Sequence, residues 1–328
     1  MKLCSVHRKR YKDILGARLL PAKRERSCPQ RLTFIPSSVL FLLCIPLALS
    51  CALTTAAEPR STVAGRARAQ QEESAQQLVR DVVWNEVRAQ VHDTTHWRFH
   101  ETQWKGAARK VYDVIQTKYG DLHRLLAIDG QPLDGKALRA ENKRIQKLCH
   151  EPQQVEQAQK ARDDDAKQEQ SMLEMLPNAF LFHEVGRQGD VVKLAFVPDP
   201  HFRPTTREAQ VFHHMEGTML VDGRQKRLVE INGELTTPVE FWGGVLGHLD
   251  AGGTFNVKQR DVGDGHWDVV YLRVNMNGKA LFFKTIAVQQ REAYTDYKRV
   301  RDDITLAQAA SVLKQDVEST PSRNLAGQ

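Results

Sequence analysis

Two runs of β-forming residues on either side of Asp222-Gly223 constrain the fold of this chain more than any other feature. The first run covers residues 209–221 and the second covers residues 226–235. Asp-Gly supplies the positive φ angles of a tight hairpin turn, so the two runs are predicted to pair as antiparallel strands. Parallel pairing would need a crossover of about a dozen residues or more, which is missing here.

A second set of strands follows this hairpin. Residues 254–262 and 266–274 are predicted as strands joined by a turn at 263–265, and a turn at 275–278 leads into another strand over 279–290. The whole region therefore predicts an antiparallel meander.

Further elements are predicted on both sides of the meander. A Gly-rich stretch over 238–253 interrupts it and is expected to be a loop, because its apolar residues have no strand period. Thr305 and Gln308 form a capping box that opens a short helix to about Lys314. Six more strands are expected at residues 97–104, 108–117, 122–128, 179–185, 190–197 and, as an edge strand, 294–300.

A helix is predicted to begin at Ser74, after a polar stretch over 58–73 that is expected to be a disordered tether. The helix carries an apolar stripe with a 3.6-residue period, which must pack against something, and the sheet is the obvious surface. The stripe consists of Ala75, Leu78, Val79, Val82, Val83 and Val87. Its polar side is expected to consist of Arg80, Asp81, Asn85, Glu86 and Arg88.

Residues 135–176 are strongly charged, rich in glutamine and without aromatic residues. They are predicted to form two helices, because Pro152 lacks the backbone donor that one continuous helix would need. The second helix is expected to end at Pro177 and has apolar residues only near that end. A helix held by so few contacts can move, so this insertion is interpreted as a lid.

These elements predict an α+β fold with a single curved antiparallel sheet of about ten or eleven strands, shaped as a half-barrel. The domain is expected over 74–316, with an N-terminal helix and the inserted lid helices, followed by a disordered tail over 317–328. A sheet this wide curls strongly, because open twisted sheets seldom stay flat beyond ~10 strands. Its concave face must then be filled by a helix or by a ligand.

The chain begins with a segment that has the three parts of an export signal. Residues 1–57 contain ten Lys and Arg residues against two acidic residues, so the net charge of +7 leaves −1 for the remainder. An apolar run over 39–49 is followed by a small-residue cleavage site at 55–57. The run is shorter than the ~20 residues that span a bilayer, although an uncleaved N-terminal anchor is the alternative. Residues 1–57 therefore predict export to the periplasm or to the outer membrane of a bacterium.

Four of the five cysteines lie in this leader, which leaves Cys149 without a partner for an internal disulfide. Cys149 is interpreted as a partly buried helix residue, and a reactive thiol is the alternative. Cys51 follows Ala48-Leu49-Ser50 and resembles the lipidated cysteine of a bacterial lipobox. Lipidation of Cys51 would anchor the protein to a membrane.

Candidate chemistry is sparse. His92, His96 and His100 have the spacing of metal ligands on a helix, but strand alternation from residue 96 onward would scatter their rings, so no metal site is predicted. His248 and Asp250 are the first candidates for a hydrolase site. No cofactor-binding motif is present, and the near-neutral body argues against a nucleic-acid partner.

The chain has more large apolar residues than one ordinary sheet face can hold. They are predicted either to line a pocket for an apolar ligand or to form a packed core. The predicted lining consists of Trp104, Tyr112, Phe182, Phe196, Phe212, Met215, Met219, Phe241, Trp242, Phe255, Trp267 and Phe282.

The order of elements resembles the LolA/LolB-like superfamily of lipoprotein-localisation carriers. The resemblance rests on the helix over 82–87, the meander over 209–235 and 254–290, and the inserted helices, and it covers most of residues 74–300. It implies an exported half-barrel whose lid helices close over an apolar cavity for acyl chains. The long charged lid segment departs from the family.

Three functions are therefore carried forward. The first is a non-enzymatic, membrane-proximal envelope protein that binds or shields a lipid or acylated ligand and carries lipid or lipoprotein. The second is an envelope scaffold or sensor that binds another protein. The third is an envelope hydrolase.

Overall fold

The computed structural model describes residues 61–241, 247–280 and 284–319. The predicted export signal with Cys51, the two aromatic residues Trp242 and Phe282, and the end of the predicted tail lie outside the described residues.

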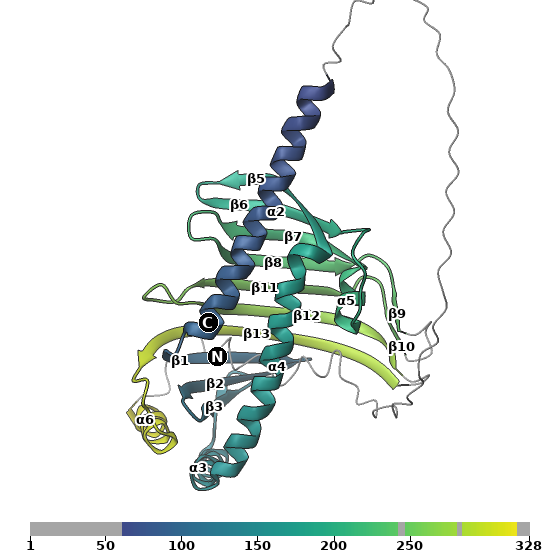
Figure 1. Cartoon of the computed structure of the whole chain (residues 1–328). Helices are drawn as coiled ribbons and strands as arrows, with labels where there is room; N and C mark the ends of the chain where they lie inside the picture. The colour runs from purple at the N-terminus through teal and green to yellow at the C-terminus, as the bar shows by residue number, and fades with distance from the viewer. Residues whose placement is uncertain (1–60, 242–246, 281–283, 320–328) are drawn as a thin grey trace, which may run out of the picture.

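Within the described residues the fold is an α+β arrangement built on one antiparallel sheet of 13 strands (Figure 1), which confirms the predicted fold class. The strand order is β4-β3-β2-β1-β13-β12-β11-β8-β7-β6-β5, and β9 and β10 extend from β12 beside the main path. The strands are β1 (His96–Lys105), β2 (Ala108–Thr117), β3 (Gly120–Ile128), β4 (Gln131–Pro132), β5 (Phe180–Gln188), β6 (Val191–Pro198), β7 (Met215–Asp222), β8 (Arg227–Leu235), β9 (Val239–Phe241), β10 (Gly247–Leu249), β11 (Thr254–Asp261), β12 (Trp267–Ala280) and β13 (Lys284–Val300).

Two long helices lie across the same face of this sheet, which we call the inner face (Figure 1). They are α2 and α4, whereas α3 and α6 lie at the end of the sheet that β2 and β3 form. The described helices are α2 (Ser61–His92), α3 (Gly135–His150), α4 (Pro152–Ala179), α5 (Arg207–Phe212) and α6 (Leu306–Ser319).

The apolar stripe of α2 packs on the inner face as predicted, with Ala75, Val79, Val82 and Val83 buried. Glu86 differs from the prediction, because it is buried rather than on the polar side. It lies one turn after Val82 and Val83, and so shares their face. Its carboxylate accepts hydrogen bonds from the backbone of Leu228 and from Arg227 of β8. Burial raises the pKa of Glu86, and the charge of Arg227 opposes that rise.

Directly paired residues form a continuous row across the inner face. The row runs from β5 to β12 through Phe182, Phe196, Gly217, Gly233, Phe255 and Val274. The two glycines are required there. A Cβ on Gly217 would lie 2.0 Å from the carbonyl oxygen of Asn232 and 2.7 Å from the Phe196 ring, and a Cβ on Gly233 would lie 2.5 Å from the Phe255 ring. Aromatic rings from the flanking strands thus cover the two glycines.

Helix side chains satisfy backbone groups on β5, at one edge of the sheet, and on β3, beyond its short pairing with β4. On β5, the amide of Gln76 accepts from the Phe182 N–H at 3.2 Å and donates to the Phe180 carbonyl at 3.0 Å. On β3, Glu141 of α3 accepts from the Leu125 N–H at 2.8 Å. Such edge groups would otherwise be free to pair with another chain.

The meander differs from its prediction at four points. Residues 207–212 form helix α5 instead of a strand, because the side chain of Thr206 caps the N–H of Ala209. The positive φ of the 222–227 turn lies at Lys226 (52°), not at Gly223. The turn expected at 275–278 is absent, because β12 continues to Ala280. The expected edge strand over 294–300 belongs to β13, which lies in the middle of the sheet between β1 and β12.

Several predicted boundaries also move. The structure places residues 61–73 in α2 rather than in a tether, since this stretch is rich in helix-forming Ala, Arg, Gln and Glu. Pro177 lies inside α4 instead of ending it, because a proline in the last turn removes only one helical hydrogen bond. The Gly-rich stretch contains β9 and β10 rather than being loop throughout, and α6 extends to Ser319.

Candidate functional site

Most of the predicted pocket residues gather in one cluster on the inner face, which we call the inner-face cluster. Phe255 of β11 packs against its edge. The members that are buried in it come from β5, β6, α5, β7 and β9, and they are Phe182, Phe196, Phe212, Met215, Met219 and Phe241.

The other described members of the predicted lining lie elsewhere. Tyr112 packs against a second cluster, whose buried members include Phe99 and Tyr294. The guanidinium carbon of Arg291 lies over the Trp104 ring, 4.3 Å from the ring centroid. Trp267 donates from Nε1 to the side chain of Gln225 at 3.1 Å, away from the inner-face cluster.

Phe180 is the centre of the aromatic contacts in the inner-face cluster, and the predicted lining omitted it. Its ring centroid lies 4.9 Å from that of Phe196, 5.4 Å from that of Phe212 and 6.2 Å from that of Phe182. The strand period could have identified it, since Phe180 precedes Phe182 by two residues and therefore faces the same side.

A small gap lies among the described side chains of the inner-face cluster. The gap among its side chains has a volume of about 20 Å³. It is bounded by apolar side chains, including Leu176 of α4. A space of this size holds about one water-sized group. In this closed arrangement the described side chains pack around the gap, which is closer to the packed core than to the ligand pocket, the two alternatives that the sequence left open.

Helix α4 covers the inner-face cluster through its last turns. Ala179 at the end of the helix is fully buried, whereas the large apolar side chains there are only partly buried, and they are Met172, Leu173, Met175 and Leu176. Earlier in the helix, Gln157, Lys160, Asp164 and Lys167 are exposed. The described contacts that hold α4 on this cluster thus come mainly from one end of the helix, where its sequence has apolar residues.

The inner face changes from apolar to polar along the sheet. On β1 and β13, Glu101 and Glu292 are fully buried. The hydroxyl of Tyr294 donates to Glu292, and Nδ1 of His123 lies 3.1 Å from Oε2 of Glu101. Glu292 is paired with Leu272, a member of the inner-face cluster, so the carboxylates share its face. Sequence reasoning missed this polar end.

The other candidate groups do not converge on the inner-face cluster. In the hydrolase candidates, Nε2 of His248 on β10 lies 3.2 Å from Oδ1 of Asp250, and the two side chains are 36% and 54% exposed. His92 ends α2, whereas His96 and His100 lie on β1. Across the described ranges, no three His, Cys, Asp or Glu side chains are grouped as a metal site.

Cys149 is a half-buried residue of α3, as the sequence indicated, and its thiol contacts the carbonyl oxygen of Leu306. Burial raises the pKa of this thiol, which disfavours the reactive thiolate. Within the part of the chain that the structure describes, none of the helices combines the length and the apolar character of a membrane span.

Comparison with known proteins identifies no family for this chain. No protein-family model, no curated protein and no solved structure matches this chain.

Proposed function

We propose that the protein binds an apolar chain, such as the acyl chain of a lipid, between the inner face of the sheet and helix α4. The observation that supports this most directly is the contrast between the inner face of the sheet and helix α4. From β5 to β12 the inner face carries a continuous row of apolar residues and glycines, whereas the large side chains through which α4 contacts it are only partly buried.

The free energies of opening α4 and of burying an acyl chain favour displacement of the end of α4 by the ligand. Full burial of one large apolar side chain contributes about 1.5–3 kcal/mol, so four partly buried ones hold the end of α4 by roughly 4 kcal/mol. An acyl chain of about twelve methylenes gains roughly 10 kcal/mol on burial, at about 0.8 kcal/mol each. A ligand of this kind can therefore displace the end of α4 and still bind.

The export signal expected from the sequence of residues 1–57 supports a role for this activity in the bacterial envelope. Acyl chains that move between membranes must cross an aqueous space, where exposed methylenes are unfavourable. A sheet that shields such a chain under a helix suits carriage of a lipid or of a lipid-modified protein.

Titration with a fluorescent fatty acid tests this proposal. Delipidated protein is expected to bind the probe saturably. Leu176→Ser weakens the contact of α4, raises the fraction of open molecules and is expected to tighten apparent binding several-fold. Glu174→Gln, on the exposed side of the same helix, is the control and leaves affinity unchanged. Absence of saturable binding to both the parent and Leu176→Ser would rule out the proposal.

A second candidate is a scaffold or sensor that binds another protein, and the small volume of the gap favours it. In that case the inner-face cluster is a permanent core. Leu176→Ser then lowers stability without creating a probe site, so the same titration separates the two candidates.

A further inference from the structure

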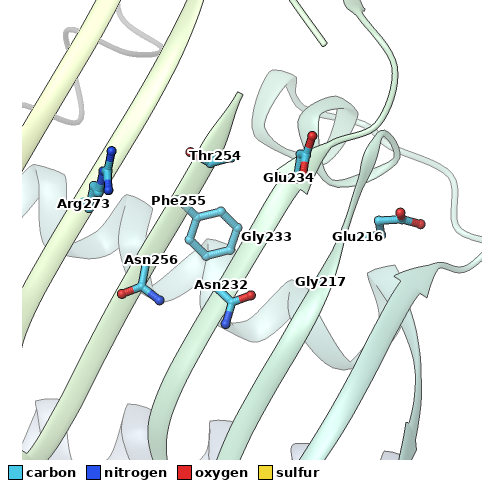
Figure 2. Close-up of a pocket in the computed structure, with 9 residues that line it drawn as sticks. All are labelled: Glu216, Gly217, Asn232, Gly233, Glu234, Thr254, Phe255, Asn256 and Arg273. Carbon is cyan, nitrogen blue, oxygen red and sulfur yellow. The ribbon is translucent and has the colours of Figure 1, made fainter. Parts of the chain in front are cut away.

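The opposite side of the sheet, its outer face, carries a hollow of about 460 Å³ (Figure 2). This volume lies within the range of small-molecule sites, about 300–1,000 Å³. The hollow is formed by β7, β8, β11 and β12, and it is lined by Glu216, Gly217, Asn232, Gly233, Glu234, Thr254, Phe255, Asn256 and Arg273.

Strand alternation explains which groups face this hollow. Phe255 pairs with Gly233, and Gly233 pairs with Gly217, so this row faces the inner side and contributes mainly its backbone to the floor. The residues before and after each of these three face outward and form two polar walls. Figure 2 shows Arg273 at one side of the hollow and Glu216 at the other, with Asn232 and Asn256 between them.

The Arg273 end of the hollow is cationic. Arg273 is directly paired with Arg291 of β13, and both side chains are exposed. Arg291 is held over the ring of Trp104 at 4.3 Å. Like charges directly opposite each other on neighbouring strands are destabilising. Within the described ranges neither guanidinium has a carboxylate partner, so an anion placed between them would relieve this repulsion.

The far end of the hollow is anionic. Glu216 and Glu234 are directly paired across β7 and β8, and both are exposed. Between the two ends, the side-chain carbonyl of Asn232 accepts from Thr218, which leaves its amide hydrogens for other acceptors. These groups together offer both donors and acceptors along the hollow.

We propose that this hollow binds an acidic carbohydrate, with the sugar carboxylate or phosphate between Arg273 and Arg291. Sugar hydroxyl groups then donate to Glu234 and Glu216 and accept from Asn232. The paired glutamates repel a chain of uniform negative charge, so the hollow does not suit nucleic acid. The site lies on the face opposite the inner-face cluster and does not depend on lipid binding.

Isothermal titration of the full chain at low salt tests this site. The probe is a trigalacturonate, and it is compared with a neutral trisaccharide, with inorganic phosphate and with triglutamate. Saturable binding is expected only for trigalacturonate, with at least tenfold weaker affinity for the other three. Binding should weaken as salt is raised, because an exposed ion pair is screened.

Variants locate the binding in the hollow. Arg273→Gln and Arg291→Gln should each weaken trigalacturonate binding at least tenfold, and Glu234→Gln should weaken it several-fold through the hydroxyl contacts. Arg260→Gln, an exposed arginine elsewhere on β11, is the matched control and leaves binding unchanged. All four positions are exposed, and circular dichroism checks that each variant is folded.

Three results overturn the proposal. One is no saturable binding of trigalacturonate. Another is equal affinity for triglutamate or phosphate, which would indicate a general anion or peptide surface. The third is binding that the Arg273 and Arg291 variants leave unchanged.

Discussion

At the scale of single residues, His266 joins three separate segments of the chain. Its ring stacks on Trp97 of β1, with 4.8 Å between the ring centroids. Nδ1 donates to Asp93, which follows α2, and Nε2 lies 3.8 Å from Asp268 of β12. Asp93 also accepts from the backbone and hydroxyl of Thr95. One imidazolium thus fixes the end of α2 against the β11–β12 hairpin.

The charge of His266 makes stability depend on pH. Burial alone would lower the pKa of the imidazole, but Asp268 and Asp93 outweigh it and raise that pKa to about 9. The stabilisation is therefore complete below about pH 6.5, where the histidine of the unfolded chain is also charged, and is lost as pH rises through 9. We expect the free energy of unfolding to fall by about 3 kcal/mol across this window.

Urea denaturation from pH 6 to pH 9.5 measures this loss. His266→Gln should be less stable at pH 6 and should show a much flatter pH dependence. His201→Gln, at an exposed histidine, should keep the dependence of the parent protein. A parent whose stability does not change over this range would contradict the assignment of the charge to His266.

At the scale of elements, the edges of the sheet are closed by side chains of neighbouring helices. Gln76→Ala removes the amide that bonds the Phe182 N–H and the Phe180 carbonyl of β5. Because Gln76 is partly buried, water replaces these bonds only in part. The free energy of unfolding is therefore expected to fall by about 1–2 kcal/mol. The freed edge should also promote self-association through β5.

Chemical denaturation and sedimentation together check the Gln76 variant. Gln77→Ala is the matched control, because Gln77 is exposed and its hydrogen bonds among the described residues stay within α2, to Asp81 and Arg80. A Gln76 variant as stable and as monomeric as the control would show that the amide does not protect the edge.

Some elements could be predicted from sequence and others could not. The 263–265 turn was predictable because Gly263, Asp264 and Gly265 all adopt positive φ. Gly278 misled the prediction for β12. A Cβ on Gly278 would lie 2.1 Å from the carbonyl oxygen of His248, so this glycine permits the close approach of β10 rather than a turn. Glycine suits both a turn and a close approach between two strands, so the sequence alone does not distinguish these two roles.

At the scale of the whole molecule, the sequence predicted a wide curved sheet with more large apolar residues than one face can hold, but it identified only part of the lining. Strand period assigns neighbouring residues to opposite faces and does not say which face a helix covers. Trp104 was therefore grouped with the pocket, although it lies beside the outward-facing Arg291. The buried pair Glu101 and Glu292 comes from strands far apart in the chain, and no local pattern brings them together.

The whole molecule is expected to open unevenly. Helix α2 buries Val79 and Val82 almost completely, whereas the large apolar side chains of α4 over the same cluster are only partly buried and Ala179 alone among the described α4 residues is fully buried there. Opening of the end of α4 should therefore cost roughly 4 kcal/mol, less than the 5–15 kcal/mol of global unfolding. Amide hydrogens near Leu176 should exchange faster than those of α2 and of β6–β8.

Hydrogen exchange followed by mass spectrometry tests this order. Leu176→Ser should accelerate exchange over residues 170–179 and leave β6–β8 unchanged, while Glu174→Gln should change neither. A bound fatty acid that holds the helix displaced should increase exchange in the same segment while slowing it in β6–β8. Equal exchange in α2 and α4, before and after the substitution, would show that α4 is part of a permanent core, and the scaffold would then be the better account of the molecule.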